Sequence, residues 1–282
     1  MVEGARFDLG AHTLPYRSEP LERALQGISA AGFKFVGLAS QHAGAPIVSE
    51  RPDRTEVASL RRRVEGFGLT PVCLMARRGA MEETEKLVAD LDLCAEMGMP
   101  YLQVLGPWPD GPDKRPKPVM QWYGEVERFL AVLSAGGKEA QRRGVTIVAK
   151  PHRGATATGA DLVDVLTRTD SPAVRCCWDA GNIRYYEGLD SEDDLERSGI
   201  APLVSTVCIK DHSGAQWNES FPVPGDGEVD HARMLRILAS AGFGGPLLLE
   251  RFDQPDSEAN DAAMLRTRTF LESVVESLES PA

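Results

Sequence analysis

The sequence has no apolar run long enough for a membrane span. A transmembrane helix needs about 20 consecutive apolar residues, and no stretch of the 282-residue chain approaches that length. The N-terminal segment MVEGARFDLGAHT also lacks the basic stretch and following apolar run of a signal peptide. We therefore expect a soluble, cytoplasmic protein with no membrane partner.

Cysteine is scarce and its spacing is uninformative for metal binding. The odd count and the absence of CxxC spacing argue against a disulfide framework or a zinc knuckle. Small buried thiols in a reducing compartment are the simpler interpretation. The cysteines are Cys73, Cys94, Cys176, Cys177 and Cys208.

Positive charge is in deficit, with 31 Lys and Arg against 42 Asp and Glu and a net charge of -11. This balance repels a phosphate backbone, so nucleic acid and anionic membranes are poor partners. A local basic pocket remains compatible with it.

What the sequence does contain is a regular alternation of apolar strand-like runs and amphipathic helical segments. The expected strands are Phe7–Gly10, Phe33–Ala39, Leu69–Ala76, Tyr101–Leu105, Val145–Lys150, Val174–Asp179, Val204–Lys210 and Leu247–Glu250. The expected helices are Glu19–Ala31, Arg54–Gly66, Glu82–Met97, Val119–Arg143, Gly159–Arg168, Val229–Ala241 and Ser257–Leu278. No GxGxxG turn follows the first strand, which disfavours an open dinucleotide-binding sheet. The order predicts an α/β fold, a single (β/α)8 TIM barrel of one domain over residues 1–282.

Polar residues gather at the ends of the later strands. In the fifth strand, alternate apolar residues face the helices, whereas Lys150 and His152 have the opposite parity. Active sites of such barrels are built at the carboxyl ends of the strands. The side chains expected at that rim are Lys150, His152, Asp179, Lys210, Asp211, His212 and Glu250.

Five segments resemble one enzyme family in their order and spacing. They are VTIVAKPHRG, WDAGNIRYYEG, VSTVCIKDHSG, FPVPGDGEVD and GPLLLER, which together lie between Val145 and Arg251. In these the chain is similar to the xylose-isomerase-like superfamily of sugar phosphate isomerases and epimerases, which includes inosose dehydratase and the tagatose and psicose epimerases. The pattern also resembles a divergent subset near the large subunits of C-glycoside deglycosidases, which act on oxidised sugars.

The resemblance implies a divalent cation (Mn, Mg or Co) held by Glu, Asp, His and Glu on strands five to eight. Asp179 and Glu250 match two of these ligands. Lys150 and Cys208 stand where the first Glu and the His are expected, and Asn182 replaces a further customary His. Because an ammonium repels a cation, the usual site cannot form unchanged.

Two outcomes remain open. In one, His152 replaces the missing ligand and the metal is held by Asp179, Glu250 and His152. In the other, the metal is absent and Lys150 pairs with Glu250 and supplies the electrophile.

We expect an enzyme that removes a proton next to the carbonyl of a ketose, keto-sugar or keto-glycoside, giving isomerisation, epimerisation or elimination. In this hypothesis Glu250 is the base, Lys150 stabilises the enediolate oxygen and His212 is a second acid/base. Candidate contacts to the carbohydrate are His12, Asn182, Lys210 and Trp108.

The alternative is a sugar-binding barrel that has lost its metal site and is non-catalytic or depends on a partner subunit. Lys150 and Cys208 favour it. The sequence does not decide between a homo-oligomer and a hetero-oligomer. A DNA-repair nuclease is the poorest option, because a trinuclear zinc site needs more than the five histidines present and the chain is acidic.

Overall fold

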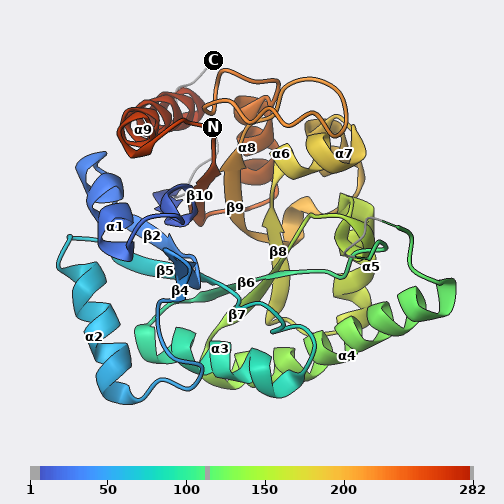
Figure 1. Cartoon of the computed structure of the whole chain (residues 1–282). Coiled ribbons are helices and arrows are strands. Elements are labelled where there is room, and N and C mark those ends of the chain that lie inside the picture. The colour runs from blue at the N-terminus through green and yellow to red at the C-terminus, as the bar shows by residue number, and fades with distance from the viewer. Residues whose placement is uncertain (1–6, 112–114, 280–282) are drawn as a thin grey trace.

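Eight parallel strands close into a barrel in the computed structural model, which describes residues 7–111 and 115–279 (Figure 1). Around the barrel their order is β1-β10-β9-β8-β7-β6-β5-β2. They are β1 (Asp8–His12), β2 (Phe35–Leu38), β5 (Thr70–Met75), β6 (Tyr101–Leu105), β7 (Thr146–Lys150), β8 (Val174–Trp178), β9 (Val204–Lys210) and β10 (Pro246–Arg251). The predicted (β/α)8 barrel is confirmed. The domain limits 1–282 stay a prediction.

Helices cover the outside of the barrel, and α9 packs beside α1 and α8 (Figure 1). The helices are α1 (Leu21–Ala30), α2 (Arg54–Glu65), α3 (Thr84–Met97), α4 (Val119–Arg143), α5 (Gly159–Thr169), α6 (Ala180–Asn182), α7 (Ser191–Arg197), α8 (His231–Ser240) and α9 (Ser257–Glu279). Two of the predicted glycine stops are left-handed helix caps, Gly98 with φ 72° after α3 and Gly144 with φ 66° after α4. Glycine adopts that conformation without a Cβ clash, so both helices end where the sequence indicates.

The two faces of the strands form separate apolar layers. Ile147 and Ala149 on β7 belong to the large cluster between strands and helices. Val148, from the same strand, packs with Cys177 and Cys208 inside the barrel. The predicted parity of β7 and β9 is therefore confirmed, and it directs the alternate side chains of these strands into the lumen.

The departures from the predicted elements include a longer β1, an additional helix and an additional hairpin. β1 runs to His12, two residues beyond the predicted end, because its backbone stays paired with β2 through Gly37. The helix α7 was not predicted, because its seven residues, SEDDLER, carry too few apolar positions for a periodic signal. The hairpin of β3 (Gln41–His42) and β4 (Ala45–Pro46) is too short to leave a pattern.

Among the described residues, no helix is both long and apolar enough to cross a bilayer.

The contact between β1 and its neighbours leaves no room for a side chain at Gly10. A Cβ there would lie 2.5 Å from the carbonyl oxygen of Phe35 and 2.8 Å from Cδ2 of Leu248. We expect Gly10→Ala to lower the free energy of unfolding by about 1–3 kcal/mol, as overpacking does. Gly124→Ala is the matched control, because nothing lies within 4 Å of its Cβ and it is inside α4. It should raise stability by up to about 1 kcal/mol. Urea unfolding measures both, and equal stability of the two variants would contradict the packing described.

Candidate functional site

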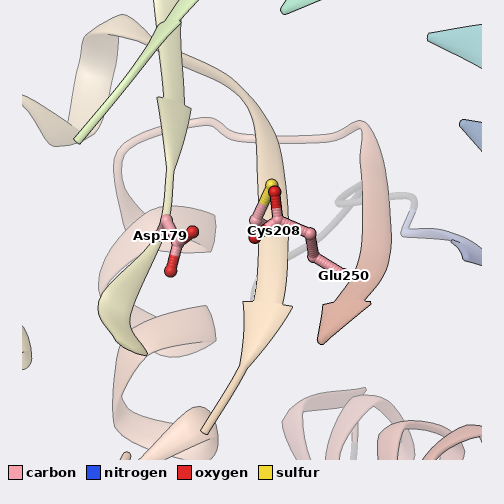
Figure 2. A group of neighbouring side chains, drawn as sticks. All are labelled: Asp179, Cys208 and Glu250. Atoms are coloured by element: carbon pink, nitrogen blue, oxygen red, sulfur yellow. The ribbon is translucent and has the colours of Figure 1, made fainter. Parts of the chain in front are cut away.

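The ends of four neighbouring strands bring two lysines and two carboxylates together inside the mouth of the barrel. Lys150 ends β7, Asp179 directly follows β8, Lys210 ends β9, and Glu250 lies near the end of β10. None of the four is more than 5% exposed. Figure 2 shows Asp179 and Glu250 approaching each other across β9.

Each lysine bridges both carboxylates. Nζ of Lys150 donates to Oε1 of Glu250 and lies 3.0 Å from Oδ2 of Asp179. Nζ of Lys210 lies 2.9 Å from the same Asp179 oxygen and 2.6 Å from Oε2 of Glu250. The formal charges of the four groups sum to zero. We call this set, Lys150, Asp179, Lys210 and Glu250, the charged cluster.

The cluster keeps its charges despite burial. Burial opposes the positive charge of Lys150, but the carboxylates of Glu250 and Asp179 outweigh it and hold the pKa of Lys150 well above its ordinary value. Burial likewise opposes the ionisation of Glu250, and Lys150 and Lys210 hold its pKa well below the ordinary value. At neutral pH Lys150 is therefore an ammonium and Glu250 a carboxylate.

A short helical turn after β8 fixes one side of the cluster. Oδ1 of Asp179 accepts from the backbone N–H of Asn182 at 2.9 Å. The side chain of Asn182 donates to the carbonyl of Pro151 at 2.8 Å and accepts from Nζ of Lys210 at 2.8 Å. Asn182, predicted as a contact to substrate, thus orients Lys210 in this structure.

A layer of soft and neutral groups lies beneath the cluster in the lumen. The thiols of Cys208 and Cys177 donate to Oε1 of Gln103 at 3.3 and 3.5 Å. Nε2 of His12 lies 3.9 Å from the sulfur of Cys208. Burial lowers the pKa of His12 to about 4, although Glu250 opposes the shift, so the ring is neutral. Burial also raises the pKa of the Cys208 thiol.

Aromatic rings close the rim above β7 and β8. Trp108 stacks on His152 with ring centroids 4.8 Å apart. Nε2 of His152 lies 3.1 Å from the hydroxyl of Tyr186. Burial, together with the positive charges of Lys150 and Lys210, lowers the pKa of His152 to about 3. His152 is therefore a neutral ring in an aromatic group.

His212 and Asp211 lie beyond β9, on the other side of the mouth. Nε2 of His212 is 2.9 Å from the carbonyl oxygen of Asn218, and its ring packs against Tyr185 and Phe221. Within the described residues its Nδ1 has no hydrogen-bond partner. Asp211 accepts from the backbone N–H groups of the loop that carries the PGDG turn.

The only candidate metal-binding group among the described residues is Asp179, Cys208 and Glu250, whose donor atoms lie within 4.8 Å of one another (Figure 2). His152 is not part of it. Both carboxylates already accept from the two ammoniums, and the thiol is neutral. A divalent cation would have to displace or deprotonate both lysines, since ammonium and metal compete for the same oxygens. This arrangement does not fit a divalent cation.

Two residues that contact the predicted site residues, Gln103 and Tyr186, were not predicted from the sequence. Gln103 lies within the apolar run YLQVL, where a single amide at a lumen position is the signal that could have indicated it. Tyr186 lies in the quoted segment WDAGNIRYYEG, but the turn that brings its ring to His152 has no sequence pattern that predicts it.

The comparisons with known proteins agree with this architecture. The chain is 26% identical over 214 residues to inosose dehydratase from Bacillus thuringiensis (strain Al Hakam), covering 68% of this chain and 70% of that protein. A xylose isomerase-like TIM barrel protein from Mycobacterium smegmatis, solved in complex with magnesium, has a TM-score of 0.77 and 14% identity and covers 99% of both chains. D-allulose 3-epimerase from Methylomonas sp., in complex with D-allulose, has a TM-score of 0.70 and 16% identity and covers 95% of this chain and 97% of that one.

The family model described as "Xylose isomerase-like TIM barrel" matches residues 25–271, which include every member of the charged cluster. This range spans β2 to β10 and most of α9. The chain belongs to the xylose isomerase-like TIM barrel family.

Proposed function

We propose that this protein is a sugar-modifying enzyme that removes a proton from the carbon next to the carbonyl of a ketose, keto-sugar or keto-glycoside. The observation that carries the proposal is the charged cluster, which places two carboxylates and two ammoniums in contact at the catalytic end of the barrel. Relatives named as a dehydratase of inosose and an epimerase of D-allulose support it. Loss of water or inversion beside a ketone both begin when the acidic C–H is broken.

The two ammoniums suit the oxygen of the developing enolate. A carbonyl whose neighbouring C–H is broken gathers negative charge on oxygen, and fixed donors in a dry site stabilise that charge strongly. Nζ of Lys150 and of Lys210 are such donors, because both are buried and held in place by the same Asp179 oxygen. Lys150 is proposed as the electrophile.

Glu250 is proposed as the base. In the resting cluster it is a weak base, because both ammoniums hold its pKa low. A substrate oxygen that accepts the hydrogen bond of Lys150 in place of Glu250 would release Oε1 of Glu250, and the basicity of this carboxylate would rise as the C–H comes within reach. The proton of the C–H bond then passes to Glu250, and the negative charge gathers on the substrate oxygen beside the Lys150 ammonium. Asp179 would keep both ammoniums in position meanwhile.

His12 and Trp108 are proposed contacts to the carbohydrate, at the floor and at the rim of the mouth. His212 is a candidate for a second proton transfer through Nδ1, since its Nε2 is already engaged by Asn218.

We propose further that this chemistry needs no divalent cation. The two sequence interpretations placed either a metal or Lys150 beside Glu250, and the ion pair of Lys150 with Glu250 favours the second. In this interpretation Lys150 does for the substrate oxygen what a Lewis acid does in a metal enzyme. In this proposal, Mn, Mg or Co could bind Asp179 and Glu250 only if both lysines were first displaced from these carboxylates.

A non-catalytic or partner-dependent barrel is the second candidate. The observation in its favour is that three of the four carboxylate oxygens of the cluster accept from ammoniums and the fourth from the backbone N–H of Asn182, which leaves none of them free in this conformation.

Deuterium exchange tests the base. Wild-type protein incubated in D2O with D-fructose, D-allulose or a 3-keto-glucoside should introduce deuterium next to the carbonyl, as followed by NMR. Glu250→Gln should slow the exchange by about 10²–10⁴-fold, the usual contribution of a general base. Glu272→Gln, on α9, is the matched control and should exchange like wild type. Full exchange by Glu250→Gln would remove this residue from the mechanism. Calorimetric binding of a ketose without exchange by the wild type would favour the non-catalytic barrel.

Restoring the ligands that the family resemblance implies tests metal independence. The double variant Lys150→Glu, Cys208→His would place Glu, Asp, His and Glu at the four positions. We expect it to bind Mn²⁺ at least about a hundredfold more tightly than wild type, a difference of about 2.7 kcal/mol. Lys150→Glu, Cys177→His is the control, because Cys177 is a lumen cysteine outside the candidate metal group. A wild type that loses both a stoichiometric metal and its exchange activity in EDTA would overturn metal independence.

A further inference from the structure

A large cavity opens beside the charged cluster, on the part of the rim formed by β5, β6 and α4. Its volume is about 850 Å³. Pockets for drug-sized ligands have volumes of about 300–1,000 Å³, so this cavity offers far more room than one monosaccharide fills. Of its lining residues, the proposed function uses only Trp108.

The cavity borders the cluster along β6. Gln103 lines it, and the same side chain accepts from Cys208, which lies beside Asp179 and Glu250. Leu105 also lines it and pairs in register with Lys150. Trp108 stands between the cavity and His152. A ligand whose sugar reaches the cluster could therefore extend into this cavity.

The walls combine apolar surface with cationic groups, of which two are in ion pairs and two are not. Leu105 and Trp108 are 42% and 39% exposed. Two of the four lining cations are neutralised, Arg77 by Asp90 and Lys117 by Glu125. This leaves two exposed arginines of the lining, Arg78 and Arg128.

Arg78 and Arg128 line the cavity, and within the part of the chain that the structure describes neither has a carboxylate within 4 Å. Glu82 and Glu83, also in the wall, share Lys86. In a chain of net charge -11, the lining of this cavity holds four cations against three carboxylates. A guanidinium recognises a carboxylate through paired hydrogen bonds.

We propose that this cavity binds the second part of the substrate, an aromatic or otherwise apolar group that bears a carboxylate. The substrate is then a glycoside-type conjugate rather than a free monosaccharide, with its sugar at the charged cluster and its carboxylate at Arg78 and Arg128. This inference rests on the proposed function for the position of the sugar, and it names the substrate class of that site.

Calorimetry with three unreactive probes tests it: 4-carboxyphenyl β-D-glucoside, phenyl β-D-glucoside and D-glucose. We expect the carboxyphenyl glucoside to bind at least tenfold more tightly than the phenyl glucoside, and the phenyl glucoside more tightly than D-glucose. One charge-assisted hydrogen bond corresponds to about a tenfold change in affinity. Arg78→Ala and Arg128→Ala should therefore each weaken the carboxyphenyl glucoside by about tenfold and leave the phenyl glucoside unchanged.

Arg142→Ala is the matched control, an exposed arginine on α4 outside the cavity, and it should bind all three probes like wild type. Equal affinity of the carboxyphenyl and phenyl glucosides, or loss of both to the same extent in the arginine variants, would overturn the proposal. Deuterium exchange of free ketoses, measured in a separate assay, tests the proposed chemistry independently of the cavity. Exchange without preference for the carboxyphenyl probe refutes only the cavity assignment, whereas arginine-dependent binding without any exchange refutes only the proposed chemistry.

Discussion

The buried ion pairs between two lysines and two carboxylates are the interaction on which the arrangement of the barrel mouth depends. Removing an ion from water costs several kcal/mol even after relaxation, and mutual attraction offsets that cost only when every charge has close partners. Here each lysine contacts both acids, so no charge lacks a partner. An apolar set of the same volume would often serve stability as well or better. The stability of the fold therefore rests on its apolar layers, and the charged set is better explained by chemistry at the mouth.

The neighbours of these charges follow from the same balance. His12 and His152 have the pKa values of about 4 and about 3 that burial imposes, and the nearby lysines further disfavour a proton on either ring. The neutral rings of His12 and His152 and the neutral thiol of Cys208 add no further charge beside the charged cluster, whose formal charges already sum to zero. Negative charge that arises on a bound molecule in the cluster is then met by the ammoniums of Lys150 and Lys210.

The sequence predicted the barrel and the positions of all eight strands, since hydrophobic periodicity and glycine stops are local signals. It also predicted that Lys150, Asp179, Lys210 and Glu250 would share one rim, because strand parity and the parallel order are sufficient for that. The pairing within the rim could not be predicted. Whether Lys150 would bond Glu250 or yield to His152 depends on side-chain distances across four strands. The stacking of His152 on Trp108, which separates it from the carboxylates, joins loops more than forty residues apart.

The carboxylate of Asp211 anchors one side of the mouth. It accepts from the backbone N–H groups of His212, Gly225, Gly227 and Val229 at 2.9–3.0 Å, and it is fully buried. Four amide anchors on one side chain tie the segment after β9 to the barrel wall. The opposite side, after β6 and β8, is held by ring contacts together with the ion pair of Arg153 with Asp110 and the hydrogen bond from Lys117 to the carbonyl of Trp108. The carboxylate of Asp211 thus sets the positions of His212 and of the PGDG turn together.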